Sequence, residues 1–117
     1  LIGQVNETKS EKQMDMFTAI FGGGPAYIYS FIDVLTQISK KAKFNNSRNM
    51  VIQTFLGSLL LLLSEKDDPV NLKKKVTSKG GTTESALSIL ENNKGLKYLM
   101  QKALKKAEQR SKELNKI

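Results

Sequence analysis

The segment from Arg48 to Lys66 constrains the fold more than any other part of this 117-residue chain, because on a helix it is apolar on nearly every side. A helix of that kind has to be buried all round. A chain of 117 residues has little with which to surround it, so we expect a large, obligate subunit interface. The apolar side chains predicted to build this interface are Ile52, Phe55, Leu56, Leu59, Leu60, Leu61, Leu62 and Leu63.

The other apolar residues also follow helical spacing. Met14, Phe17 and Phe21 predict a short helix that ends at a triple glycine, and Pro25 suits the start of the next helix. No segment alternates apolar and polar residues over a sustained run, so the sequence predicts an all-α domain. The further helices are expected at about 25–42, 48–66, 69–76, 83–92 and 95–114.

The start of the chain differs in composition from the rest. Residues 6–13 are polar without an apolar period, so we interpret residues 1–13 as a linker or the tail of a missing domain, and 14–117 as one helical domain. Leu1 to Val5 resembles neither an initiating segment nor a signal peptide and is interpreted as a cut end. An excised fragment, half of a split enzyme and a decayed remnant all fit this pattern.

Composition excludes several classes of function. The chain has no cysteine and no histidine, which removes disulfide scaffolds, thiol nucleophiles, imidazole bases and the usual zinc ligands, and a cytoplasmic location fits. The absence of cysteine and histidine also means that no metal site is expected. The net charge of +8 comes mainly from lysines spread over several predicted helices without interleaved aromatic residues, so nucleic-acid binding is not expected. No apolar run reaches the roughly 20 residues that span a bilayer.

A loop rich in glycine and hydroxyl groups precedes the helix predicted from Thr83. It reads Val-Thr-Ser-Lys-Gly-Gly-Thr-Thr over residues 76–83. Glycines allow successive backbone N–H groups to point one way, and the following helix adds a partial positive charge, so such a loop can bind an anion. Serine or threonine before a helix is also an N-cap and Gly-Gly is also a turn, so a purely structural interpretation stays open.

Together with an upstream sequence, this loop resembles a known family. Gly-Gly-Gly-Pro-Ala-Tyr at 22–27 is followed by an apolar helix with Gln53-Thr54 and Gly57, and then by the 76–83 loop. This order is similar to that of the carboxy-terminal domain of pyrroline-5-carboxylate reductase, and the likeness runs from about Met14 to the end of the chain. Proteins of that family reduce the C=N bond of 1-pyrroline-5-carboxylate to give L-proline, using NADPH or NADH.

The resemblance implies a helical bundle that forms an intertwined dimer, like the carboxy-terminal domain of 6-phosphogluconate dehydrogenase. It implies a homodimer or higher oligomer in which two subunits build each site. The family holds its cofactor in a Rossmann domain, and these 117 residues contain no strand followed by Gly-x-Gly-x-x-Gly. We therefore expect no cofactor bound to this chain, and activity only with a Rossmann half supplied by a separate chain.

The resemblance also implies roles for particular residues. The backbone N–H groups of Gly80, Gly81 and Thr82 would bind the substrate carboxylate, and Thr83 would be the catalytic residue, placing its hydroxyl near the ring nitrogen. Ser78 would be a further hydrogen-bond donor. Three small residues at the start of a helix would lie beside the nicotinamide ring: Gly24, Pro25 and Ala26. Turn and helix start alone would also explain these three.

The chain departs from the family pattern at three places. Lys79 replaces a usual proline, Lys74 stands where aspartate is common, and Gly22 stands where a small polar residue is common. Lys79 removes a fixed φ from the loop. These lysines favour an alternative, a non-catalytic helical dimerisation module or relic, whereas the intact residues 80–83 favour the reductase. A third alternative, nonspecific binding of nucleic acid by the lysines, predicts affinity that falls steeply with salt.

Overall fold

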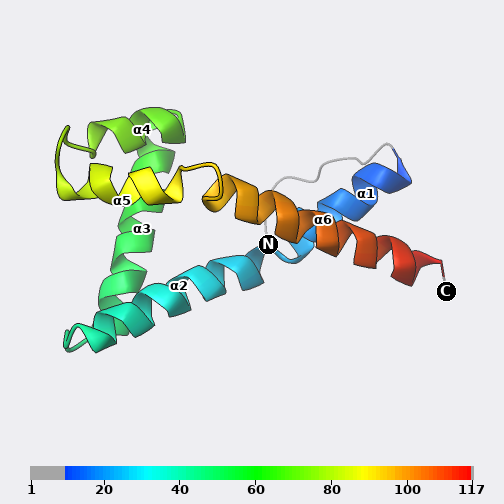
Figure 1. The fold of residues 1–117 in the computed structure, drawn as a ribbon, viewed down its shortest axis with the longest axis horizontal. Helices are drawn as coiled ribbons and strands as arrows, with labels where there is room; N and C mark the ends of the chain where they lie inside the picture. Colours follow the sequence, from blue (N-terminus) through cyan, green and yellow to red (C-terminus); the bar gives the residue numbers. More distant parts are fainter. Residues whose placement is uncertain (1–9, 117) are drawn as a thin grey trace. The chain divides into compact units, whose positions relative to one another are not determined.

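The computed structural model describes residues 10–116, and every regular element in that range is a helix (Figure 1). The predicted all-α fold is therefore confirmed. Contacts divide the chain into two units, one from residues up to Tyr27 together with those from Asn93, and one from residues 28–92. The elements are α1 (Glu11–Phe17), the π-helical turn η1 (Thr18–Gly22), α2 (Gly24–Lys41), α3 (Ser47–Glu65), α4 (Pro69–Lys75), α5 (Thr82–Leu90) and α6 (Leu96–Asn115).

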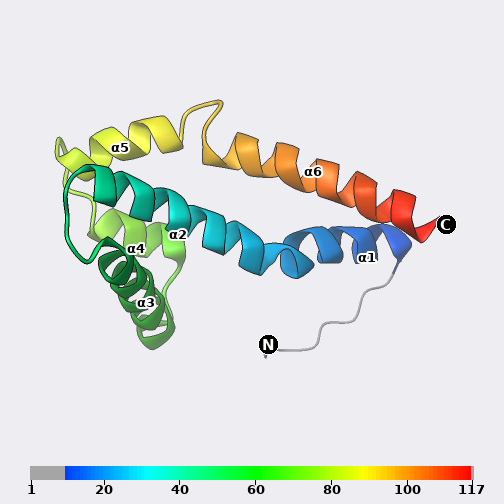
Figure 2. The same cartoon turned by 90° about the horizontal axis from the view of Figure 1, so that it is seen from below.

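In the first unit, α1 packs along α6, and η1 contacts both helices (Figure 2). Asp15 of α1 is only 5% exposed. Its carboxylate accepts hydrogen bonds from Ser111 Oγ at 2.7 Å and from Asn115 Nδ2 at 2.9 Å. Both donors belong to α6, so a buried carboxylate joins helices from opposite ends of the chain, and its donors compensate for its loss of water.

The first helix begins at Glu11, three residues before the predicted start at Met14 and inside the segment interpreted as a tail. The reason is a local cap, since Ser10 Oγ accepts a hydrogen bond from the N–H of Gln13 at 3.2 Å. Glu11 adds a favourable negative charge to the first turn. The predicted tail before Ser10 lies outside the described residues.

The triple glycine does not simply end the first helix. Thr18–Gly22 forms a π-helical turn, which the N–H of Gly23 closes by donating to Thr18 O at 3.2 Å. The Tyr27 hydroxyl donates to Ala19 O at 2.6 Å. A Cβ on Gly23 would collide with that hydroxyl, so only glycine fits there without rearrangement. The next helix then begins at Gly24, one residue before the predicted Pro25.

The second unit contains α3, α4, α5 and the remainder of α2. Phe31 of α2 meets Phe55 of α3 edge to face, with ring centroids 5.4 Å apart. Asp68 caps α4 by accepting from the N–H of Val70 at 3.0 Å, and Pro69 is its first residue, as predicted. An ion pair between Lys73 and Glu91 joins α4 to the end of α5.

Most apolar side chains of a single chain remain exposed. Within residues 10–116, only Ala19 and Val51 are buried apolar side chains. The predicted inner faces of α2, α5 and α6 are open, with Phe31 44%, Leu90 44% and Leu99 61% exposed. A single chain therefore leaves α3 without a core around it, as its leucines show: Leu56 46%, Leu59 55%, Leu60 56%, Leu61 45% and Leu63 72% exposed.

Candidate substrate-binding loop

The glycine-rich loop lies between α4 and α5 in the second unit, where hydrogen bonds fix both of its ends. At the start, Thr77 Oγ1 donates to Lys73 O at 2.6 Å and its N–H donates to Lys74 O at 3.3 Å, so Thr77 extends the last turn of α4. At the other end, the N–H of Gly81 donates to Ser78 O at 3.1 Å. Residues 78–81 therefore form a tight turn that leads into α5.

Both glycines meet a steric requirement of this turn. Gly80 has a φ of +74°, in the left-handed region that side chains disfavour. A Cβ on Gly81 would lie 3.3 Å from Ser78 O, closer than most real contacts of this kind. The backbone can therefore reverse direction within four residues.

Among residues 10–116, no side chain caps the amino terminus of α5. Its N-cap is Gly81, which has no side chain to bond the N–H groups of the first turn. Thr82 and Thr83 are the first two residues of this nine-residue helix, and both are exposed. Their N–H groups and hydroxyls therefore lie together where the helix has its partial positive charge.

The structure brings together the residues predicted to bind the substrate, since all five lie within the six consecutive positions 78–83 around one turn: Ser78, Gly80, Gly81, Thr82 and Thr83. Their backbone groups are not equivalent. The N–H of Gly81 is bonded to Ser78 O at 3.1 Å and that of Gly80 to Glu84 Oε1 at 2.8 Å. Two of the three N–H groups predicted to bind a carboxylate thus have acceptors within the chain.

A hollow of about 350 Å³ lies beside the loop, between α4 and α5. Its lining combines opposite charges, including Lys73, Lys74, Glu84 and Glu91. Lys74, one of the departures from the family pattern, therefore lies next to the candidate site. Thr77 and three further residues complete the lining: Val70, Leu87 and Ser88.

The residues predicted to lie beside a nicotinamide ring are Gly24, Pro25 and Ala26, in the first unit at the start of α2. Pro25 and Ala26 are exposed, and open space surrounds the position that a Cβ on Gly24 would take. These three residues form the first turn of α2.

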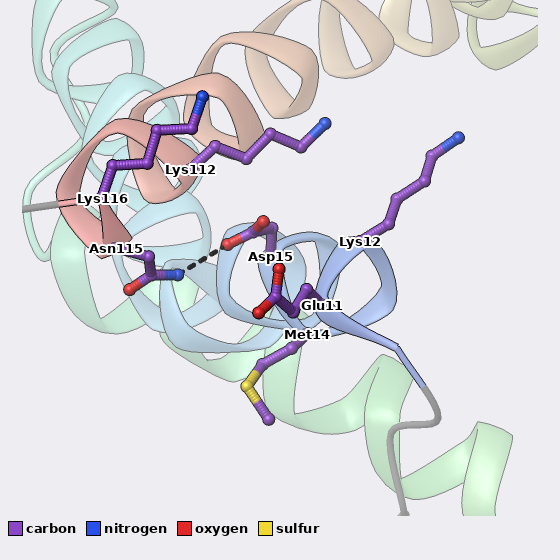
Figure 3. A pocket seen from close by; sticks show the side chains of 7 residues that line it. All are labelled: Glu11, Lys12, Met14, Asp15, Lys112, Asn115 and Lys116. Carbon is purple, nitrogen blue, oxygen red and sulfur yellow. Dashed lines mark hydrogen bonds between the residues drawn. The ribbon is translucent and has the colours of Figure 1, made fainter.

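A second hollow, of about 570 Å³, lies between α1 and the end of α6 (Figure 3). Its lining is of mixed charge and contains none of the predicted site residues: Glu11, Lys12, Met14, Asp15, Lys112, Asn115 and Lys116. Within residues 10–116, no cluster of acidic, histidine or cysteine side chains could hold a metal ion. In the same part of the chain, no helix is both long and apolar enough to cross a bilayer.

Sequence reasoning missed two polar contacts. The contact between Glu84 and Gly80 had a local signal, because glutamate at the third helical position often bonds back to the N–H groups before the helix. The contact of Asp15 with Ser111 had none, since these residues are 96 positions apart.

Helices with exposed apolar faces and no strand among residues 10–116 define an all-helical assembly domain. The chain belongs to the pyrroline-5-carboxylate reductase dimerisation family, whose model matches residues 11–114.

Curated relatives and solved structures agree with this family. The chain is 37% identical over 106 residues to the pyrroline-5-carboxylate reductase of Pseudomonas aeruginosa, covering 89% of this chain and 38% of the relative. It is 36% identical over 119 residues to pyrroline-5-carboxylate reductase 1 of Bacillus subtilis, covering 98% and 40%. The Plasmodium falciparum pyrroline carboxylate reductase with NADP bound matches with a TM-score of 0.80 and 37% identity, over 91% of this chain and 41% of that one. The chain thus spans about two fifths of the length of these proteins.

Proposed function

We propose that this chain is the carboxy-terminal, dimerising and substrate-binding half of a pyrroline-5-carboxylate reductase, which reduces 1-pyrroline-5-carboxylate to L-proline. The observation that carries the proposal is the loop at 78–83, in which the candidate substrate-binding residues lie at the uncapped start of α5. Family membership and the matched relatives support it.

Substrate recognition follows from the chemistry of the loop. The ring of the substrate carries a carboxylate, and the first turn of α5 offers backbone N–H groups and a positive dipole end to such a group. Ser78 and Thr82 add exposed hydroxyls that can donate to the same carboxylate. The loop therefore orients the ring by its charged substituent.

Thr83 is the residue that acts on the reacting bond. It is the second residue of α5, so its hydroxyl lies at the same helix end as the carboxylate-binding groups. Reduction of an imine requires a protonated nitrogen or a nearby proton donor. A threonine hydroxyl is too weak an acid to protonate the nitrogen alone, so Thr83 orients the ring nitrogen or relays a proton to it.

The nicotinamide cofactor supplies the hydride when it is bound. Residues 10–116 include no strand, and hence no strand, glycine loop and helix that could hold its pyrophosphate. They do not fit the nucleotide by themselves, and Gly24, Pro25 and Ala26 offer it only a small contact surface. A Rossmann domain must supply the rest of the site.

The proposed partner is a second copy of the chain. The exposed leucines of α3 and the open faces of α2 and α6 require another apolar surface, and an intertwined helical dimer provides one. A higher oligomer built from such dimers is compatible with the same faces.

The test is NADPH-dependent reduction of 1-pyrroline-5-carboxylate by the chain alone and by the chain mixed with a Rossmann half made from one of the matched reductases. We expect activity in the mixture only, and a fall in kcat of about 100-fold in Thr83→Ala. Ser88→Ala is the matched control, because it removes from the same helix a hydroxyl that donates to Ser85 O and makes no hydrogen bond with the loop among residues 10–116. A folded dimer that associates with the Rossmann half but has no activity would instead show a non-catalytic dimerisation module.

A further inference from the structure

Glu84 lies directly after the proposed substrate-binding residues, and its carboxylate reaches back to the loop. Glu84 is the third residue of α5, and its Oε1 accepts a hydrogen bond from the N–H of Gly80 at 2.8 Å. The acceptor is a charged side chain and the donor is the glycine with the left-handed φ of +74°. Charge-assisted bonds of this kind are stronger than neutral ones.

Two N–H groups of the loop already have acceptors within the chain and are therefore not free to bind a ligand. Gly80 donates to Glu84, and Gly81 donates to Ser78 O. Thr82, Thr83 and Glu84 form the first turn of α5, where N–H groups have no acceptor within the helix, whereas the N–H of Ser85 already donates to Gly81 O at 3.2 Å. An incoming carboxylate therefore meets the N–H groups of Thr82 and Thr83.

We propose that Glu84 is a positioning residue that holds the substrate loop in the turn at residues 78–81. By bonding the N–H of Gly80 it fixes the left-handed turn, and that turn presents the first-turn N–H groups of α5. The inference rests on the proposed function and refines it, since the substrate carboxylate binds at Thr82 and Thr83 and the N–H of Gly80 is reserved for Glu84.

The opposite role for Glu84 makes an opposite prediction. A carboxylate beside an anion-binding site also repels an anionic substrate. If Glu84 mainly repelled the substrate, its removal would lower KM. If Glu84 positions the loop, its removal raises KM, because the turn loses its order and the N–H groups are no longer aligned before binding.

The first experiment measures steady-state kinetics of the chain combined with its Rossmann half. Glu84→Ala should raise KM for 1-pyrroline-5-carboxylate about fivefold, the effect of one lost hydrogen bond, with kcat changed less than about twofold. Glu84→Gln should give an intermediate KM, because its amide oxygen still accepts from Gly80. The matched control is Glu91→Ala, which removes a carboxylate from the same hollow that pairs with Lys73 and not with the loop. An unchanged or lower KM in Glu84→Ala would overturn the inference.

A second readout does not need turnover. In the isotope-labelled chain within the same complex, the amide proton of Gly80 should shift upfield in Glu84→Ala, while L-proline as the probe should shift the amides of Thr82 and Thr83 more than that of Gly80. If L-proline binds in this way but no reduction occurs, the proposed function fails and the positioning role stands. A Gly80 resonance unchanged in Glu84→Ala, or no response to L-proline, would overturn the inference.

Discussion

Replacing Leu60 with aspartate tests the most consequential feature of the fold, the apolar surface of α3. Leu60 is 56% exposed in the single chain, and the other leucines of α3 named above are 45% to 72% exposed. Complete burial of a leucine contributes about 1.5–3 kcal/mol, so covering the exposed half of each contributes about 1 kcal/mol. For the five exposed leucines of α3 on each of two chains, the gain in the free energy of association is about 10 kcal/mol. This gain is comparable with the cost of association of about 4–15 kcal/mol.

Aspartate at position 60 removes the contribution of this one leucine and places a charge on a surface that has to be buried. The loss is about 1 kcal/mol per chain from the leucine, and the desolvation of an unpaired carboxylate costs several kcal/mol more. The dimer loses two such side chains, so its association should weaken by at least about 1000-fold. Because residues 10–116 of a single chain bury almost no apolar side chains, we expect Leu60→Asp to yield unfolded or aggregated protein, and the same result for Leu63→Asp.

The assay is sedimentation equilibrium together with far-ultraviolet circular dichroism, at equal protein concentrations. Ser64→Asp is the matched control, because it adds the same charge one residue beyond Leu63 at an exposed polar position of α3. This control should remain a folded oligomer. A soluble, well-folded monomer from Leu60→Asp would refute the reasoning, since it would show that α3 needs no covering surface.

Two further predictions concern stability. Asp15→Ala should lower the free energy of unfolding by about 3 kcal/mol in urea denaturation, because two hydrogen bonds to a buried carboxylate are lost; a loss below about 1 kcal/mol would contradict this, and exposed Glu11→Ala is the control. Hydrogen bonds from the Asn71 amide, from the N–H of Asp68 and from Lys75 hold the pKa of Asp67 below its usual range. Ionised Asp67 therefore stabilises the fold above about pH 4, and this stabilisation is lost as the pH falls through the lowered pKa. Between about pH 5 and 2, Asp67→Ala should therefore lose less stability than the wild type does. About 1 M salt should shrink that difference, and an identical acid dependence of both proteins would contradict it.

The helices could be predicted from sequence because their signals are local. Asp68 and Pro69 mark a helix start through a side-chain cap and a fixed φ, and the structure begins α4 at Pro69. Apolar spacing predicted α2 and α6 to within about one residue at each end. The loop could be found for the same reason, because its glycines and hydroxyls are adjacent in the chain.

Features that depend on distant partners could not be predicted. The π-helical turn at Thr18–Gly22 is closed with the help of the hydroxyl of Tyr27, a contact that apolar spacing does not encode. The burial of Asp15 depends on residues of α6 at the other end of the sequence. The amphipathic pattern also did not predict which helix faces a single chain buries. The predicted inner faces of α2 and α6 are exposed to solvent in the single chain.

The bonds between α1 and α6 also set an order of assembly. Asp15 and Ser111 are separated by 96 positions, and closing a loop of that length costs about 4 kcal/mol of chain entropy. Helices α3, α4 and α5 belong to the continuous segment 28–92, whose contacts can form before α6 leaves the ribosome. The α1–α6 pair forms only after α6 itself has been synthesised. We therefore expect this pair to be the last to close in a newborn chain.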